Sequence, residues 1–468
     1  MRRATLTLAL SITSSLVLTS CLKGPNYSRP KVDVPTDYHG PSSTVNADEA
    51  QSLGHAKWWS IFKDDALQKL IRTAIGQNYD LRIAASRVLE AHEAVTIARS
   101  DQVPTVSGGA TLSGTRYRYF PDRSQTKNNI VELGLSFGWD VDFWGKYRRL
   151  TEAARADLMA TDWARRGVVN GLVSSVAAAY FELRTLDLEL EISRRTLASR
   201  QDSLDLTRAL VNGGAAPLTD QRQAEQLVEA AALSIPNLER QVQQLENAIN
   251  ILLGRNPGAP IERGLVLAEQ LAPEVPPPGI PSTLLDRRPD IAQAEQDLVA
   301  ANARIGVARA AFFPDITLTG LGGVASSALG NLFRSNPKSW DYNASVMEPI
   351  FTRGRLKANL RQIEAQREQA LLAYQQTIQQ AFRDVSDGLI AYQKFRESRV
   401  HQERLLAAAK DAADLARTRY QGGATSYLEV LTNETNSFSA EIGLATALLN
   451  ERLAVVQLYG ALGGGWEQ

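Results

Sequence analysis

The sequence predicts a mainly α-helical chain of mixed α and β class, built as an internal duplication with two β-strands in each copy. Three observations predict this fold class. Motifs recur in the same order about 210 residues apart, each copy holds a proline-free stretch long enough for one very long helix, and each copy holds runs in which apolar and polar residues alternate. Ordered recurrence indicates a repeated unit, and the two periodicities indicate helices and strands.

The duplication is carried by pairs of matching segments. In chain order, 78–99 matches 288–309, 206–208 matches 415–417, 213–215 matches 422–424, and 253–254 matches 462–463. Single matches arise by chance, but collinear matches over a whole half do not. Each copy is therefore expected to contain a helix, two strands, a very long helix, a tight turn and a further helix.

Two very long helices are predicted from the absence of proline. No proline occurs between Pro121 and Pro217, and none follows Pro349. The ranges 146–211 and 355–421 are predicted as helices, each roughly 100 Å long at about 1.5 Å per residue. Helices of this length without internal caps are not typical of a globular enzyme.

The strand pattern is clearest over 129–144. Successive apolar residues from 131 to 143 alternate with small or acidic ones, which predicts a strand with one apolar face. An apolar face suits lipid and a polar face suits water, as in a transmembrane β-barrel. A soluble sheet packed on the helices is the alternative. The other strands are predicted at 104–119, 315–328 and 340–351.

Four strands are too few to close a barrel. An open strand edge in lipid leaves backbone groups unpaired, at a cost of several kcal/mol each. The chain is therefore expected to oligomerise. A dimer would close eight strands around an interior that side chains nearly fill, whereas a trimer would close twelve and leave room for a conduit.

Composition excludes several classes of function. The chain has 51 basic and 51 acidic residues, so no net field draws it to nucleic acid. Its mean hydropathy of -0.22 argues against a bundle of membrane helices. The four histidines show no metal-ligand spacing, and no nucleophile–base pair or phosphate loop stands out. The sequence therefore predicts no catalytic residue, no metal ligand and no enzyme.

The N-terminus is predicted to be a targeting segment, with a signal peptide over 1–20. Two arginines precede an apolar stretch that is shorter than a typical membrane-spanning helix. Leu18-Thr19-Ser20-Cys21 matches the lipobox of bacterial lipoproteins, so Cys21 is predicted to carry a covalent lipid, a diacylglycerol with an N-acyl group such as palmitate. Leu22 follows, where an Asp would retain the protein in the inner membrane, and this indicates the outer membrane.

Further motifs are spread over the mature chain. In order they include Gly24-Pro25-Asn26-Tyr27, Trp58-Trp59-Ser60-Ile61-Phe62, Asn78-Tyr79-Asp80-Leu81, Leu252-Leu253-Gly254 and Arg287-Arg288-Pro289-Asp290-Ile291. In this order and spacing they resemble the TolC/OprM-like outer-membrane factor family, in its lipoprotein (NodT-type) branch. The resemblance covers nearly the whole mature chain.

The resemblance implies a homotrimer with a twelve-stranded transmembrane β-barrel and a periplasmic α-helical barrel. It implies an outer-membrane channel for efflux, a passive exit duct for drugs or other small molecules. A periplasmic adaptor and a proton-driven inner-membrane pump would deliver them. The alternatives are an exit duct for type I protein secretion, one for metal-ion efflux, and a lipid-anchored periplasmic coiled-coil scaffold.

The same plan divides the chain into consecutive parts. They are a lipid-anchored extended segment at 21–60, a first repeat at 61–258, an equatorial crossover at 257–281 and a second repeat at 282–468. The crossover is rich in proline and glycine, which is typical of an irregular connection.

Two turns are the candidate adaptor-binding tips. They lie at 212–217, with Gly213 and Gly214, and at 422–426, with Gly422 and Gly423, and helices are predicted to follow them at 218–253 and 427–462. Glycine permits the left-handed conformation that ends a helix. The simplest interpretation of each turn is that it joins the two helices of a hairpin. The resemblance implies in addition that the turns bind an adaptor.

Arg419 and Tyr420 are the candidate gate residues. They match positions where the family holds the tunnel tip closed with hydrogen bonds and ion pairs. Capping of the helix C-terminus is the alternative for Arg419, because helix C-termini favour cations. Some relatives carry acidic residues in the following helix where this chain has Thr425 and Thr432, so an acidic ring at the mouth is not predicted.

Overall fold

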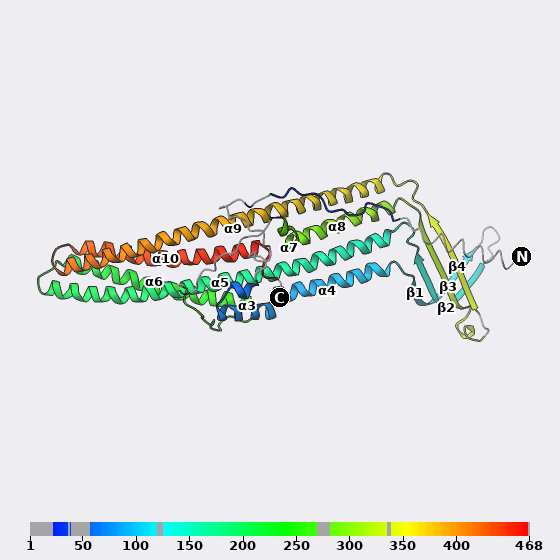
Figure 1. Ribbon diagram of the computed structural model, residues 1–468. Coiled ribbons are helices and arrows are strands. Elements are labelled where there is room, and N and C mark those ends of the chain that lie inside the picture. The colour runs from blue at the N-terminus through cyan, green and yellow to red at the C-terminus, as the bar shows by residue number, and fades with distance from the viewer. Residues whose placement is uncertain are drawn as a thin grey trace. The chain divides into compact units, whose positions relative to one another are not determined.

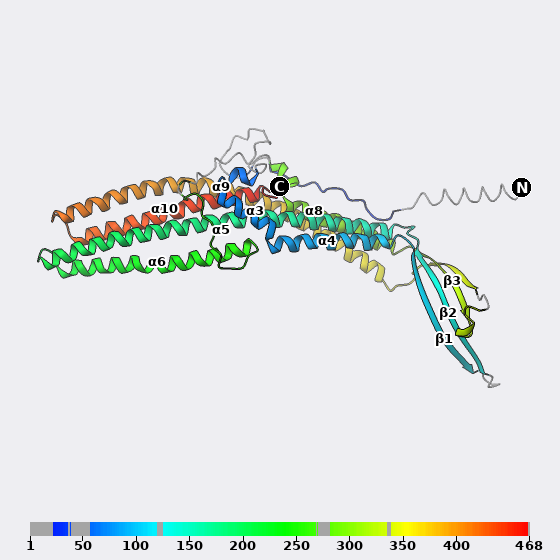
Figure 2. The same ribbon diagram turned by 90° about the horizontal axis from the view of Figure 1, so that it is seen from below.

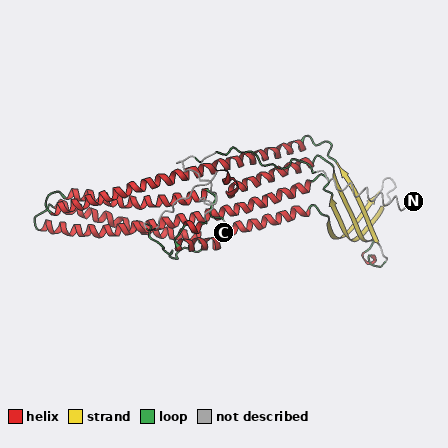
Figure 3. Ribbon diagram, viewed as in Figure 1, coloured by secondary structure: helices red, strands yellow, loops and turns green. Residues whose placement is uncertain are grey.

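The computed structural model describes residues 22–35, 38, 57–118, 125–267, 269, 281–334 and 338–466. Over these residues the chain is mainly helical and has one four-stranded sheet (Figures 1 and 3). The predicted fold class is confirmed. The predicted signal peptide and Cys21 lie outside the described residues.

The two copies share the order of their main elements, which are a helix, two strands, a very long helix and a further helix. The first contains α2 (Trp58–Ile61), α3 (Asp65–Gln77), α4 (Tyr79–Ser100), β1 (Thr105–Arg118), β2 (Gln125–Asp140), α5 (Lys146–Asn212) and α6 (Leu218–Leu252). The second contains η3 (Pro281–Thr283), α7 (Leu284–Arg287), α8 (Pro289–Ala310), β3 (Asp315–Ser326), η4 (Leu329–Asn331), β4 (Lys338–Met347), α9 (Arg355–Gln421) and α10 (Tyr427–Ala461). Three pairs of equivalent helices have equal lengths: 22 residues in α4 and α8, 67 in α5 and α9, and 35 in α6 and α10.

The chain folds as two compact units. The sheet unit consists of the described residues within Met1–Lys31, Arg87–Asp162 and Gln293–Gln375. The helical unit consists of those within Val32–Ser86, Trp163–Ala292 and Gln376–Gln468. All four strands belong to the sheet unit, and both turns that follow the long helices belong to the helical unit. No described helix is both long and apolar enough to cross a membrane.

The strand predicted at 129–144 lies four residues earlier, as β2. The reason is local, because Asp142 accepts hydrogen bonds from the backbone N–H groups of Tyr147 (3.2 Å) and Arg148 (2.9 Å) and so begins helix α5. Trp144 leaves the sheet and stacks on Phe313, with ring centroids 4.6 Å apart. The predicted alternation continued into this aromatic cluster, which is not part of the strand.

The strand predicted at 340–351 is also shifted, since β4 begins at Lys338 and ends at Met347. Pro349 follows two residues later and has no N–H to give to a sheet ladder. The segment 348–351 therefore lies outside the sheet, and Ile350 and Phe351 in it are exposed.

The sheet is an antiparallel meander in the order β1-β2-β3-β4, so β1 and β4 are its two edges. The helices of the sheet unit follow the same order. Thr151 of α5 donates to the Ala98 carbonyl of α4, Arg304 of α8 pairs with Asp157 of α5, and Arg309 of α8 pairs with Glu364 of α9. Each lateral edge of this unit is therefore formed by the first or the last of its strands and helices (Figure 1).

In the helical unit a buried carboxylate fixes the segment that follows α6. Asp64 caps α3 by accepting from the Ala66 N–H, and it also accepts from the Tyr180 hydroxyl of α5 and the Leu265 N–H. Burial of this kind is tolerated when the charge is fully hydrogen-bonded. The unit also contains two helical hairpins, α5 with α6 and α9 with α10 (Figure 2).

Candidate functional sites in the sheet and the helix turns

The register of the sheet sorts its side chains onto two faces, since directly paired residues point to the same side. Leu135 pairs with Gly108 and Gly322, and Gly322 pairs with Trp340. The face that contains this row is called the apolar face. It also carries Val106, Leu112, Val131, Leu133, Phe137, Leu318, Val324, Tyr342 and Val346.

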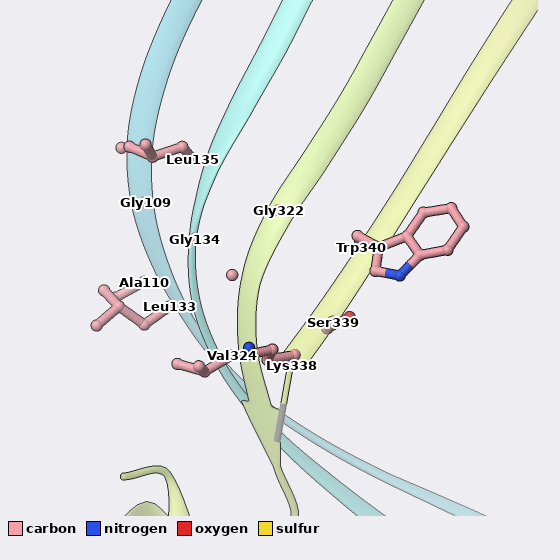
Figure 4. A pocket seen from close by; sticks show the side chains of 12 residues that line it. Gly109, Ala110, Leu133, Gly134, Leu135, Gly322, Val324, Lys338, Ser339 and Trp340 are labelled. Carbon is pink, nitrogen blue, oxygen red and sulfur yellow. The ribbon is translucent and has the colours of Figure 1, made fainter. Parts of the chain in front are cut away.

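The opposite face, called the polar face, carries mainly hydroxyl, acidic and glycine residues. It includes Ser107, Thr111, Glu132, Ser136, Asp140, Thr317, Thr319, Ser339, Asp341, Asn343 and Ser345. Gly109, Gly134 and Gly323 form a row across three of its strands. A Cβ at Gly323 would lie 2.3 Å from the Leu133 carbonyl oxygen, so the strands approach too closely there for any side chain. Figure 4 shows this stretch of the four strands.

The apolar face is open to solvent in the single chain. The exposed fraction is 61% for Leu135, 72% for Trp340 and 80% for Tyr342. The rings of Trp340 and Tyr342 stack in parallel, with centroids 6.0 Å apart. Large apolar surfaces on a soluble monomer are rare, so this face is expected to meet an apolar environment.

The segment that follows Cys21 is tied firmly to the sheet unit. Arg149 of α5 is almost fully buried, and its guanidinium donates to the carbonyls of Lys23 and Gly24 and to Asn26 Oδ1 (2.7 Å). The Lys23 N–H donates in turn to the Trp144 carbonyl. The segment 23–26, which follows the predicted lipid attachment site, is thus held beside the junction of β2 and α5.

The two predicted tips have the same backbone geometry. Gly214 and Gly423 adopt left-handed conformations, with φ of +71° and +70°. After α5, the Ala215 N–H donates to the Leu210 carbonyl and the Gly214 N–H to the Val211 carbonyl. Equivalent bonds follow α9, and this pair of bonds is the Schellman motif that ends a helix at glycine.

The two candidate gate residues donate to carboxylates in different repeats of the chain. Arg419 donates to Glu429 Oε1 (3.1 Å), so it joins the two helices of one hairpin. The Tyr420 hydroxyl donates to Asp220 Oδ2 (3.3 Å) and joins the second copy to the first. Burial, and then the Asp220 charge, raise the pKa of Tyr420 above its ordinary value, so the phenol keeps the proton that it donates.

The acidic partners, Asp220 and Glu429, were not predicted from the sequence. Both are the third residue of the helix that follows a tip, at equivalent places in the two copies. An acid in a first turn is favoured by the helix dipole, and that position was the available signal. Glu429 also accepts from Thr425 and is paired with Arg419.

Polar and apolar contacts connect all four helices behind the tips. Arg417 of α9 donates to Ser199 of α5 and to Glu434 of α10, and Arg200 of α5 donates to the Leu227 carbonyl of α6. An apolar cluster packs beside them, formed by Leu204, Ala224, Val228, Ala416, Tyr427 and Val430. The tips are thus supported by a packed four-helix layer.

The chain matches the family model described as outer membrane efflux protein, at residues 70–255 and 280–464. It is 39% identical over 470 residues to the probable efflux pump outer membrane protein TtgC of Pseudomonas putida, covering 98% of this chain and 95% of that protein. It is 36% identical to the cation efflux system protein CusC of Escherichia coli, with 97% and 98% covered.

A third relative and a solved structure agree with these matches. The probable outer membrane lipoprotein SilC of Salmonella typhimurium is 33% identical, with 98% of each chain covered. The open-state MtrE outer membrane channel of Neisseria gonorrhoeae superposes with a TM-score of 0.86 at 32% identity, covering 96% of this chain and 99% of that one. The fold is therefore that of the TolC/OprM-type outer-membrane channels. The chain belongs to the outer membrane efflux protein family and is an outer-membrane exit duct of a tripartite efflux system.

Proposed function

We propose that three copies of this chain form a passive duct through which drugs or other small molecules leave the cell. The observation that carries the proposal is a four-stranded sheet with one apolar face, one polar face and two unpaired edges. In a bilayer such edges must pair, and three sheets give twelve strands around a water-filled interior. The polar face would then line the duct, and the apolar face would meet lipid.

Exposed apolar side chains along both lateral edges of the sheet unit support ring closure. On α4, Leu89 and Ile97 have exposed fractions of 69% and 67%. Beyond β4, Ile350 and Phe351 reach 95% and 84%. Two different exposed edges on one chain fit a heterologous, head-to-tail contact, which closes into a ring when the rotation allows it.

The tips are proposed to receive the periplasmic adaptor, and the adaptor to connect the duct with a proton-driven inner-membrane pump. Their identical Schellman turns offer the same docking shape twice per chain. The relative named toluene efflux pump outer membrane protein TtgC, from another strain of Pseudomonas putida, supports efflux of organic molecules. The name of CusC favours metal cations as the second candidate cargo. The chain is proposed to do no chemistry on its cargo.

The mouth is proposed to be held closed mainly by Tyr420. A hydrogen bond to a charged group contributes about 1.5–3 kcal/mol, and the bond from Tyr420 to Asp220 joins the two internal repeats of one chain. The Arg419–Glu429 pair has exposed fractions of 57% and 36%, and surface pairs contribute at most about 1 kcal/mol. Arg419 therefore acts as the supporting member of the gate.

Cys21 is proposed to anchor the chain to the outer membrane through its covalent lipid. The hydrogen bonds from Arg149 to residues 23–26 support this role, because they would hold the lipid attached to Cys21 close to the end of the sheet that joins α5. The relative SilC, named an outer membrane lipoprotein, supports it as well.

The oligomeric state tests the proposed function directly. The protein extracted in mild detergent is expected to give the mass of three chains in native mass spectrometry, because only further strands can satisfy both sheet edges. A stable monomer or dimer that conducts ions in planar bilayers would contradict the twelve-stranded duct.

The assignment of the two faces is tested by one substitution on each. Leu135→Arg places a charge on the apolar face and is expected to destabilise the assembled channel by about 2–4 kcal/mol near the bilayer midplane. Ser136→Arg, on the polar face, serves as the matched control and is expected to assemble normally. The measurement is the fraction of heat-resistant trimer in outer-membrane extracts, and equal losses in both variants would refute the assignment.

The gate is tested by conductance. Tyr420→Phe removes the bond between the copies, and the double variant with Arg419→Ser is expected to raise single-channel conductance further and to admit large antibiotics. Arg222→Ser, which removes an exposed pair within α6, is the matched control and should conduct as the wild type does. Wild-type conductance in an intact double-variant trimer would mean that these residues are only helix caps.

The anchor is tested by metabolic labelling. Cys21→Ala is expected to abolish incorporation of radiolabelled palmitate, since no other thiol exists in the chain. Lys23→Ala, two residues away, should still be labelled. Palmitate on the mature Cys21→Ala protein would show that the lipid is attached elsewhere.

A further inference from the structure

The charged side chains of the strands are sorted by face. Among the strand side chains that the structure describes, the acidic ones are Glu132, Asp140, Asp315 and Asp341, and the register places all four on the polar face. The basic ones are Arg116, Lys127 and Lys338, and all three lie on the apolar face. Among these described side chains, the face expected to meet lipid therefore carries charge of one sign only.

Two of these bases form a pair at the end of the sheet that is remote from the helices. Arg116 of β1 is directly opposite Lys127 of β2, and both are exposed. Two residues further into the sheet, Gly114 is opposite Asn129, and a further two residues in, Leu112 is opposite Val131. Each of these steps is about 7 Å along the strands. The basic pair thus lies just beyond an apolar stretch of the same face.

That apolar stretch forms the floor of a groove. The connection that contains η4 encloses, with β1 and β2, an open groove of about 720 Å³. Val131 and Leu332 in its wall are buried, whereas Leu329 and Phe333 on the same connection have exposed fractions of 71% and 77%. Glu132 borders the groove through its backbone position, but strand alternation directs its side chain to the polar face.

We propose that this groove binds a phosphorylated, acylated glycolipid of the outer leaflet, with one acyl chain in the groove and a phosphate on Arg116 and Lys127. The apolar lining suits the hydrocarbon, and the bases beyond it lie where a headgroup would begin. Guanidinium and ammonium groups bind phosphate through charge-assisted hydrogen bonds. The absence of described acidic strand side chains from this face fits an anionic ligand.

A second copy of the chain fits this groove less well. Strand pairing between copies uses the edges β1 and β4, whereas the groove lies on the face of β1 and β2. An anionic headgroup also matches the positive charge of Arg116 and Lys127. The inference rests on the proposal that the apolar face meets the bilayer, and it adds a specific lipid to that contact.

The test is lipid binding by the intact, detergent-solubilised channel in native mass spectrometry. The probes are bis-phosphorylated lipid A, monophosphoryl lipid A and phosphatidylethanolamine. The wild type is expected to retain bis-phosphorylated lipid A most strongly. Arg116→Gln with Lys127→Gln is expected to weaken its binding about tenfold, because the charged hydrogen bonds to phosphate are lost. The preference over monophosphoryl lipid A should disappear with it.

The matched control is Thr115→Asp with Asn128→Asp. These two residues are also directly opposite each other, one position away on the polar face, and the net charge changes by the same amount. Lipid A binding by this control should stay at the wild-type level. Wild-type binding by the glutamine variant, equal loss in the control, or equally strong phosphatidylethanolamine binding would each overturn the proposal. The same spectra report the trimer mass, so a failure of assembly is distinguished from a failure of this site.

Discussion

An unpaired backbone group in hydrocarbon can be satisfied only by another strand, and much of this molecule follows from that constraint. The sheet has two free edges and one apolar face, so it cannot be stable in a bilayer by itself. In the proposed assembly, its neighbours are further copies of the same sheet. Exposed apolar side chains beside both edges agree with further strands that pair there. The glycine row across three strands lets the strands approach each other closely. Association of the chains and insertion of their sheets into the membrane are then one process.

The long elements could be read from the sequence because their causes are local. Helix α9 occupies the range predicted for it, and α5 extends one residue further, because proline is absent within them and glycine ends them. The faces of β2 followed from a period of two, but its end did not. Asp142 begins α5 before the apolar alternation stops, and the last apolar residue of that alternation, Phe143, packs on Trp144 and not in the strand. Local patterns predicted the elements and failed where a side chain had a distant partner.

The contacts that give the sites their character are distant in sequence and were not predicted. Tyr420 meets Asp220 across 200 residues, and Arg149 reaches Asn26 across 123. The groove on the apolar face also depends on a connection between β3 and β4 that folds back beside β2. Each of these residues has a type that is common at its position in a helix or strand. No periodicity or motif therefore identifies its distant partner. Such contacts require the fold itself.

The duplicated hairpins are alike in backbone but not in the bond that joins them. Within a chain, Tyr420 of the second copy reaches Asp220 of the first. The residue equivalent to Tyr420 in the first copy is Val211, which has no hydroxyl to offer to Glu429, the equivalent of Asp220. In a ring of six hairpins, the Tyr420–Asp220 bond would therefore recur at the three seams within chains, and its counterpart would be missing at the three seams between chains. The mouth would then have pseudo-six-fold shape, but this lock would have only three-fold symmetry.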